Sequence, residues 1–208
     1  MTPSEAYEKC LKQGSRDLGL EPIILQDPGW SYCYARDVIK GRWVEGEGVI
    51  LQSSEWSFCY AYDVVRGRWV EGEEVILQDP DCSYRYARYV IKGRWIKAEG
   101  VILQDPYWSY CYALDVIEGR WVEGEASILQ DPKWSYRYAR NVIKGRWIEG
   151  EPIILQDPEW SYCYARYVIE GRWVEAEEII LGSEWESIYC DRFRIEPCEL
   201  VPKPDYTL

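Results

Sequence analysis

Apolar and polar positions repeat along this chain with a fixed period, which tryptophan marks most clearly. Tryptophan recurs with a 13-residue period from Trp30 to Trp173, and Cys82 fills the one vacant position. Two such periods make a 26-residue unit, as in 27–52, which reads DPGWSYCYARDVIKGRWVEGEGVILQ. A period between about 20 and 50 residues is typical of proteins in which each copy stacks on its neighbours. The pattern therefore predicts a tandem repeat architecture.

The first half of each repeat has capping residues typical of the two ends of a helix. Asp27 suits the N-cap and Pro28 the first helical position, where a backbone N–H is not needed. Gly41 lies where a left-handed residue would end the helix. The buried face that we expect combines an i, i+4, i+8 series with two flanking residues: Trp30, Tyr34 and Val38, with Ala35 and Ile39.

The second half, from Arg42 to Gln52, predicts a shorter helix whose start is open. Three apolar residues are expected to pack inward: Val44, Ile50 and Leu51. Two copies carry a proline, Pro22 or Pro152, where a helix starting at the Val44 position would already donate an N–H. The helix is therefore expected to be short, to be kinked, or to begin only near Glu47.

A β interpretation has support from the many Tyr, Trp, Val and Ile residues. Strict alternation does not persist through Val38-Ile39 or Val49-Ile50-Leu51, whereas helix caps and helical spacing recur in every copy. We therefore predict an all-α fold, an elongated α-solenoid of about six helix-turn-helix repeats. Residues 1–26 form N-terminal capping half-repeats, 27–182 the repeats, and 183–208 a divergent C-terminal cap with an extended tail.

Charge and hydropathy narrow the function. The chain has 24 Lys and Arg against 36 Asp and Glu, a net charge of −12, which argues against a nucleic-acid partner. No apolar run approaches the roughly 18 residues that span a bilayer, and the first residues lack the features of a signal peptide. The sequence predicts a cytoplasmic protein without a membrane segment.

The cysteines follow the repeat. One position holds Cys33, Cys59, Cys111 and Cys163 in four copies and Arg85 and Arg137 in the two others. A position that accepts both residue types is expected to be partly exposed and not bridged, so reduced thiols are predicted. The chain has no histidine and no CxxC spacing, and we expect neither a metal site nor a cofactor.

The motif DPxWSYxYAxxVIKGRWxExE, as in 131–151, resembles tandem short-repeat proteins encoded by bacteriophages and some large viruses. The resemblance covers about 21–181. It implies a helical repeat array, often of unknown function, with no catalytic residues to transfer, and the host cytoplasm as the compartment. Many relatives have proline after Gly-Arg-Trp, where this chain has Val44, Val70, Ile96, Val122, Ile148 and Val174.

Differences between the copies predict a binding surface. They concentrate at five positions on one face of the first helix, those of Gly29, Cys33, Arg36, Asp37 and Lys40. A varied surface on a constant scaffold favours protein binding, although solvent-exposed positions also drift without selection. The predicted partner-binding residues are Cys33, Arg36, Asp37, Lys40, Tyr62, Asp63, Arg85, Arg88, Tyr89, Leu114, Arg137, Arg140, Arg166 and Tyr167.

A second surface is acidic. Its predicted residues are Glu45, Glu71, Glu123, Glu149 and Glu175. Such an edge attracts a basic partner at low salt. The arginine after each glycine, Arg42 in the first copy, is expected to be part of a structural ladder, in which it bridges a neighbouring glutamate or caps the carbonyls of the preceding helix. Trp30, Trp43, Ala35 and Gly41 are likewise predicted to be structural.

The chain has 12 Trp and 18 Tyr but 2 Phe, which predicts an aromatic core with polar tips. No nucleophile, phosphate-binding loop or unique polar cluster interrupts the repeats, so we do not expect an enzyme. The sequence predicts a scaffold that binds a protein. The resemblance to phage and viral repeat proteins makes the concrete expectation a phage-encoded inhibitor of a host defence protein. Two alternatives stay open: a tyrosine-rich protein that sequesters a small molecule or nucleotide, and a self-assembling homo-oligomer.

Overall fold

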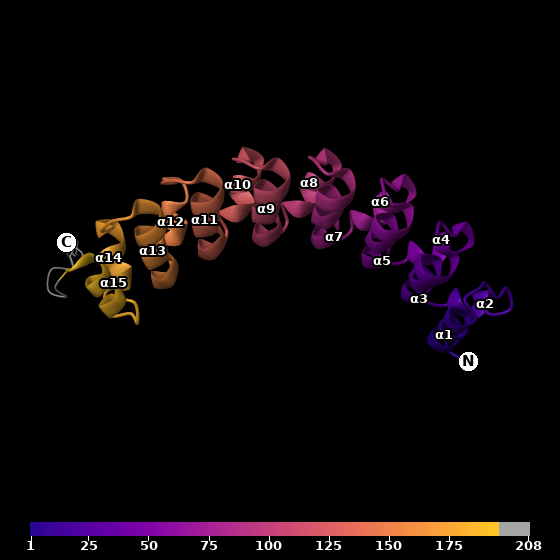
Figure 1. Cartoon of the computed structure of the whole chain (residues 1–208). Helices are drawn as coiled ribbons and strands as arrows, with labels where there is room; N and C mark the ends of the chain where they lie inside the picture. Colours follow the sequence, from indigo (N-terminus) through magenta and orange to yellow (C-terminus); the bar gives the residue numbers. More distant parts are fainter. Residues whose placement is uncertain (196–208) are drawn as a thin grey trace, which may run out of the picture. The chain divides into compact units, whose positions relative to one another are not determined.

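The structure, a computed structural model, describes residues 1–195, which form helices joined by short loops and contain no strand (Figure 1). The chain divides into two compact units, Met1–Gln104 and Asp105–Leu208, which we call unit 1 and unit 2. The helix pairs recur with a 26-residue period, for example in helices that begin at Pro28, Ser54 and Pro80. The predicted all-α tandem repeat is therefore confirmed.

Each repeat contains an α-helix that runs into a short π-helical segment (η), followed by a second α-helix. Unit 1 contains α1 (Pro3–Gln13), α2 (Glu21–Ile24), α3 (Pro28–Tyr34), η1 (Ala35–Ile39), α4 (Val44–Ile50), α5 (Ser54–Cys59), η2 (Tyr60–Val65), α6 (Val70–Ile76), α7 (Pro80–Arg85), η3 (Tyr86–Ile91) and α8 (Ile96–Ile102).

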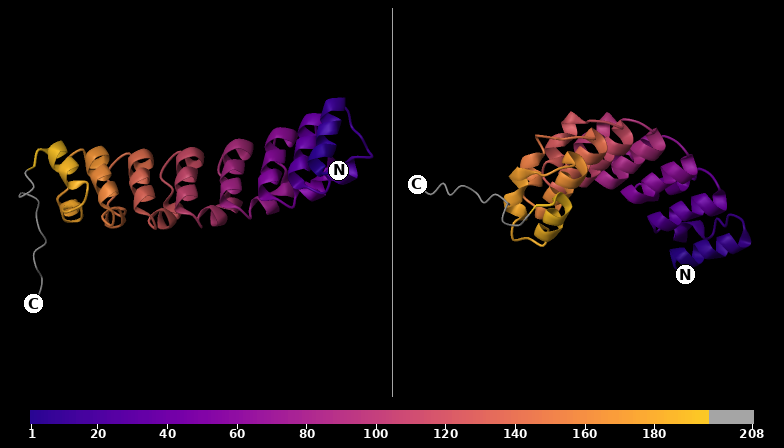
Figure 2. Two further views of the ribbon diagram at one scale, coloured as in Figure 1. Left: turned by 90° about the horizontal axis from the view of Figure 1, so that it is seen from below. Right: turned by 60° about the vertical axis from the view of Figure 1, so that its left-hand side comes forward.

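Unit 2 repeats the same order, and α15 is the last helix of its described residues. It contains α9 (Pro106–Tyr112), η4 (Ala113–Ile117), α10 (Val122–Ile128), α11 (Pro132–Tyr138), η5 (Ala139–Ile143), α12 (Glu151–Ile154), α13 (Pro158–Tyr164), η6 (Ala165–Ile169), α14 (Val174–Ile180) and α15 (Glu186–Phe193). Within each unit, the first helices of successive repeats lie side by side in chain order (Figure 2).

The first helix begins as predicted but ends differently. The Asp27 side chain accepts a hydrogen bond from the N–H of Trp30 at 2.9 Å, and Pro28 takes the first helical position. The left-handed residue is Lys40, with φ 58°, and not Gly41, so the predicted C-cap was wrong by one residue. The cause is the π-helical ending, in which the Gly41 N–H bonds the Ala35 carbonyl at 3.2 Å.

The second helix starts at Val44 in most copies. In the two copies with proline it starts at Glu21 or Glu151, as the missing N–H requires. Val44 itself is 68% exposed and does not pack inward, whereas Ile50 is fully buried. The expectation for Val44 was therefore wrong. Its side chain points outward because the preceding residue, Trp43, takes the inward position at 1% exposure.

The core face of the first helix is also shifted from the prediction. Tyr34 and Ala35 are fully buried, and the Tyr34 ring meets Trp43 edge-on with centroids 4.9 Å apart. Trp30 is only half-buried, and its ring lies against Tyr7 of α1 with centroids 5.2 Å apart. The 13-residue tryptophan series therefore alternates between the core of a repeat and the seam between repeats.

A buried polar ladder locks each second helix to the next first helix. Arg42 holds Glu47 with two hydrogen bonds, of 2.6 and 3.2 Å. The Tyr60 hydroxyl donates to Glu47 at 3.1 Å and accepts from the Trp43 N–H at 2.7 Å. Unit 2 repeats this arrangement around Glu125 and Glu151. The predicted bridging of each arginine to the second glutamate is therefore present.

The ends of the array follow the repeat logic as well. Thr2 caps α1 with a reciprocal capping box to Glu5, and Gly14 ends that helix in the left-handed conformation. At the other end, α15 supplies Tyr189, whose hydroxyl accepts from the Trp173 N–H at 2.8 Å. The helix thus fills the place of a next repeat. The predicted extended tail lies outside the described residues.

Within residues 1–195, no helix is long and apolar enough to span a bilayer.

Candidate interaction surface

A polar junction joins the first helices of neighbouring repeats in unit 1. Tyr32 on α3 donates a hydrogen bond to Asp63 on η2. Arg36, one turn after Tyr32, donates to the same tyrosine oxygen at 2.8 Å. The preceding junction is similar, because Tyr7 donates to Asp37 at 2.8 Å. Both carboxylates are half-buried, so these side chains hold neighbouring repeats together.

The next junction in unit 1 is aromatic. Phe58, which has no hydroxyl, takes the tyrosine position, and Tyr62 and Tyr89 take the positions of the arginine and the carboxylate. The Phe58 and Tyr62 rings stack with centroids 6.0 Å apart, and Tyr62 meets Tyr89 edge-on at 6.1 Å. All three positions change together, so no buried carboxylate faces a ring that lacks a donor.

Unit 2 shows two further versions. The Asn141 side-chain amide donates to the Tyr110 hydroxyl oxygen at 2.7 Å. In the next junction, Arg140 donates to Tyr136 at 2.8 Å and lies over the Tyr167 ring, 4.4 Å from its centroid. Each pair is again complementary in hydrogen bonding or in cation–π attraction.

These contacts explain part of the variation between copies. Asp37, Asp63, Tyr89 and Tyr167 belong to the predicted partner surface, yet each contacts a side chain of an earlier repeat. Sequence reasoning missed this role because it compared one position at a time. Comparing each tyrosine position with its contact in the following repeat would have shown that the two partners change together. Their part in binding a partner stays a prediction.

Exchanging one junction for another tests this coupling. Tyr32→Phe alone leaves Asp63 without a hydroxyl donor and should lower the free energy of unfolding by about 1 kcal/mol. Adding Arg36→Tyr and Asp63→Tyr transplants the aromatic junction and should recover most of that loss, because the three substitutions couple. Urea denaturation followed by circular dichroism measures both variants. A triple variant less stable than Tyr32→Phe would refute the coupling.

The Cys or Arg position lies beside the same junctions. Cys33, Cys59 and Cys163 are half-buried, but Cys111 is buried, which contradicts the expectation of partial exposure at that copy. Cys33, Cys59 and Cys163 carry free thiols, and burial raises the pKa of the Cys33 thiol.

The two arginines at this position make ring contacts. Arg85 lies over the Phe58 ring at 4.3 Å, and Arg137 over Trp134 at 5.3 Å. Trp56 stacks on Tyr32 of the preceding repeat, with ring centroids 5.4 Å apart. In the next repeat Cys82 takes the place of this tryptophan, so Phe58 has no tryptophan ring to stack on. Arg85 therefore covers the ring that this substitution would leave bare.

The other predicted partner-binding residues lie along the same helix face. Arg88 donates to the Tyr84 hydroxyl oxygen, and Arg166 donates to the Tyr162 oxygen at 2.6 Å. Leu114 is half-buried. Tyr62 and Tyr89 keep 49% and 41% of their surface exposed despite their contact with each other.

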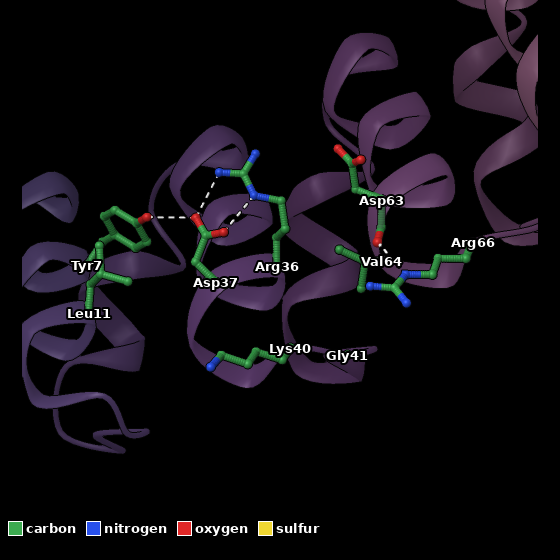
Figure 3. Close-up of a pocket in the computed structure, with 9 residues that line it drawn as sticks. All are labelled: Tyr7, Leu11, Arg36, Asp37, Lys40, Gly41, Asp63, Val64 and Arg66. Carbon is green, nitrogen blue, oxygen red and sulfur yellow. Dashed lines mark hydrogen bonds and ion pairs between the residues drawn. The ribbon is translucent and has the colours of Figure 1, made fainter.

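The ends of the first helices in unit 1 line a groove (Figure 3). One cavity of about 600 Å³ is lined by Tyr7, Leu11, Arg36, Asp37, Lys40, Gly41, Asp63, Val64 and Arg66. A second, of about 400 Å³, is lined by Tyr62, Asp63, Arg66, Gly67, Tyr89, Val90 and Lys92. Asp63 and Arg66 line both, so the two cavities adjoin, and we call them together the unit 1 groove.

The charged side chains of the groove differ in whether they form ion pairs within the protein. Arg36 holds Asp37 with two hydrogen bonds, of 2.7 and 2.8 Å, and thereby lowers the pKa of that carboxyl group. Lys40, Arg66 and Lys92 are exposed, and no carboxylate of the described residues forms an ion pair with them. Arg66 donates to the Asp63 carbonyl of its own segment, at 3.2 Å.

The predicted acidic edge is exposed on the second helices and, at Glu149, on the turn before α12. Glu71 contacts Arg42 of the preceding repeat at 3.1 Å, and Glu149 contacts Arg120 at 3.6 Å. Both glutamates keep more than half of their side-chain surface exposed, so each contact is a weak surface ion pair. The acidic residues alternate with exposed apolar side chains such as Val44 and Val70.

Within residues 1–195, no group of three or more His, Cys, Asp or Glu side chains is arranged to hold a metal ion. Comparisons of the chain with protein-family models, with curated proteins and with solved structures find no match.

Proposed function

We propose that this chain is a non-catalytic repeat scaffold that binds a protein partner along the unit 1 groove. The observation that carries the proposal is the exposure of large side chains there: Tyr62 and Tyr89 are 49% and 41% exposed and stand beside exposed cations. Tyrosine and arginine are the residues that protein interfaces use most for binding energy. The ladder of Arg42, Glu47 and Tyr60 keeps the scaffold constant while the groove side chains vary.

The resemblance of the repeat motif to tandem repeat proteins of bacteriophages and large viruses extends this proposal. On that basis the partner is a protein of the infected host, bound in the host cytoplasm, and binding inhibits it. The mechanism is occlusion of a surface, which needs no catalytic group.

Affinity capture from a host cell extract tests the proposal. The tagged full chain is compared with Tyr62→Ala/Tyr89→Ala in the groove and with Val44→Ala/Val70→Ala on the acidic edge. We expect the wild type and the edge variant to retain the same host protein and the groove variant to lose it, as mass spectrometry would show. Circular dichroism confirms that each bait is folded.

Reversing Arg36 or Asp63 would be a poorer test, because their hydrogen bonds join neighbouring repeats around Tyr32. Tyr62 and Tyr89 also contact each other, but only through their rings, and they keep 49% and 41% of their surface exposed. Capture of nothing by a folded wild-type chain would contradict the proposal. Loss of the partner in the edge variant alone would place binding on the acidic edge and contradict the assignment to the groove.

A further inference from the structure

Three cations of the unit 1 groove occupy equivalent and unusual positions. Lys40, Arg66 and Lys92 each end a π-helical segment with a positive φ, of 58°, 57° and 59°. A side chain in the left-handed region costs roughly 1 kcal/mol relative to glycine. The neighbouring glycine, such as Gly41, does not take that conformation. The same backbone conformation recurs at this position in every repeat, so only the side chain differs between copies.

The copies in unit 2 provide an internal contrast. The same strained position holds Glu118, Lys144 and Glu170 there. Over the nine equivalent positions that line this face, unit 1 has five cations and two carboxylates, whereas unit 2 has three of each. In unit 1 they are Arg36, Tyr62, Arg88, Asp37, Asp63, Tyr89, Lys40, Arg66 and Lys92; in unit 2 they are Leu114, Arg140, Arg166, Asp115, Asn141, Tyr167, Glu118, Lys144 and Glu170.

The contrast extends to the whole units. Residues 1–104 contain 13 Lys and Arg and 16 Asp and Glu, and residues 105–208 contain 11 and 20. The net charges are therefore −3 and −9, which together give the −12 of the chain. The chain as a whole is strongly acidic, yet this groove is cationic. Lys40, Arg66 and Lys92 form no ion pair with a carboxylate of the described residues, so the packing of the repeats does not explain why cations are placed there.

We propose that the unit 1 groove binds an extended, acidic polypeptide segment of the partner protein; this inference rests on the proposed function. The cations provide the charge complement, and the exposed rings of Tyr62 and Tyr89 with Val64 and Val90 provide apolar contact between them. The half-buried carboxylates of the groove accept hydrogen bonds from the backbone N–H groups of the segment.

The spacing of the groove cations favours a bound segment in the extended conformation. Neighbouring helices pack about 8–10 Å apart, and an extended chain advances about 3.3 Å per residue. Successive cations therefore face every third residue of the segment. A nucleic acid is disfavoured because Asp37 and Asp63 line the same cavity as Lys40 and Arg66 (Figure 3), and phosphates, unlike a polypeptide, bring no backbone N–H groups to these carboxylates.

Fluorescence anisotropy with the full chain tests the inference. The probe is a fluorescein-labelled peptide of about five Gly-Ser-Glu repeats, which places a carboxylate at every third residue. Lys40→Glu/Arg66→Glu/Lys92→Glu should weaken binding by at least about tenfold, because three attractive pairs become repulsive. The variant should fold, since Glu118 and Glu170 already occupy this position with φ 57° and 58°.

Lys144→Glu is the matched control, with the same substitution at the same strained position in unit 2, and it should leave the affinity unchanged. Absence of peptide binding, or equal binding by the triple variant, would overturn the inference. Tighter binding of a labelled oligothymidylate than of the peptide would overturn it as well. Capture of a host protein by a chain that does not bind the peptide would refute only the acidic class, and the proposed function would stand.

Discussion

Glu47→Ala should lower the free energy of unfolding by about 2–3 kcal/mol, because it leaves the buried Tyr60 hydroxyl without its acceptor. The carboxylate is 9% exposed and accepts from both Tyr60 and Arg42. The Arg42 side chain is 44% exposed, so water solvates it in the variant, and its lost ion pair adds little to the decrease in the free energy of unfolding. Urea denaturation of the full chain, followed by circular dichroism, measures the change.

Glu45→Ala is the matched control. Glu45 lies two residues earlier on the same helix, is exposed and contributes no side-chain hydrogen bond within the described residues. Its removal should change the stability by no more than about 0.5 kcal/mol. Equal effects of the two substitutions would show that the ladder is not a source of stability.

Alkaline pH should unfold the chain over a narrow window. Burial raises the pKa of Tyr7, Tyr86, Tyr138 and Tyr189 from 10.0 to about 12. Between these values the unfolded chain has lost protons that the folded chain retains, so stability falls as pH rises. Each tyrosine contributes a loss of about 2 kcal/mol by the upper end of the window. Below pH 10 these groups leave stability unchanged.

The measurement is a pH titration that records helical circular dichroism together with the ultraviolet absorbance of tyrosinate. We expect the buried tyrosines to ionise in the same step in which the helical signal is lost. Ionisation of all tyrosines with the helical signal intact would contradict the prediction, because it would mean that the buried hydroxyls titrate without unfolding.

Local features of the fold could be predicted where a few neighbouring residues decide them. The cap by Asp27 depends only on the next three residues, and the capping box of Thr2 on Glu5 is equally local. The ion pair of Arg42 and Glu47 joins near neighbours in the chain. Both residues are the same in every copy, and this predicted their structural role. These elements needed no knowledge of the neighbouring repeats.

Positions that depend on packing were predicted less well. The π-helical ending at Ala35–Ile39 has no residue signature, and it moves the left-handed position to Lys40. The same limit applies to Val44, since a helix start is local, whereas the direction of its first side chain depends on which neighbour, here Trp43, is buried. Hydrophobicity alone assigns both residues to the core.

The sequence by itself determined the 26-residue period, the helical class and the starts of the first helices, because capping and periodicity act over one or two turns. Only the tertiary structure decided which varied side chains face a neighbouring repeat and which face solvent. Asp63 and Lys40 vary alike between copies, yet the first meets Tyr32 across a junction and the second stands free in a groove. That difference arises because helices of successive repeats, which are far apart in the chain, pack against each other. A local sequence pattern does not specify which residues meet in this packing.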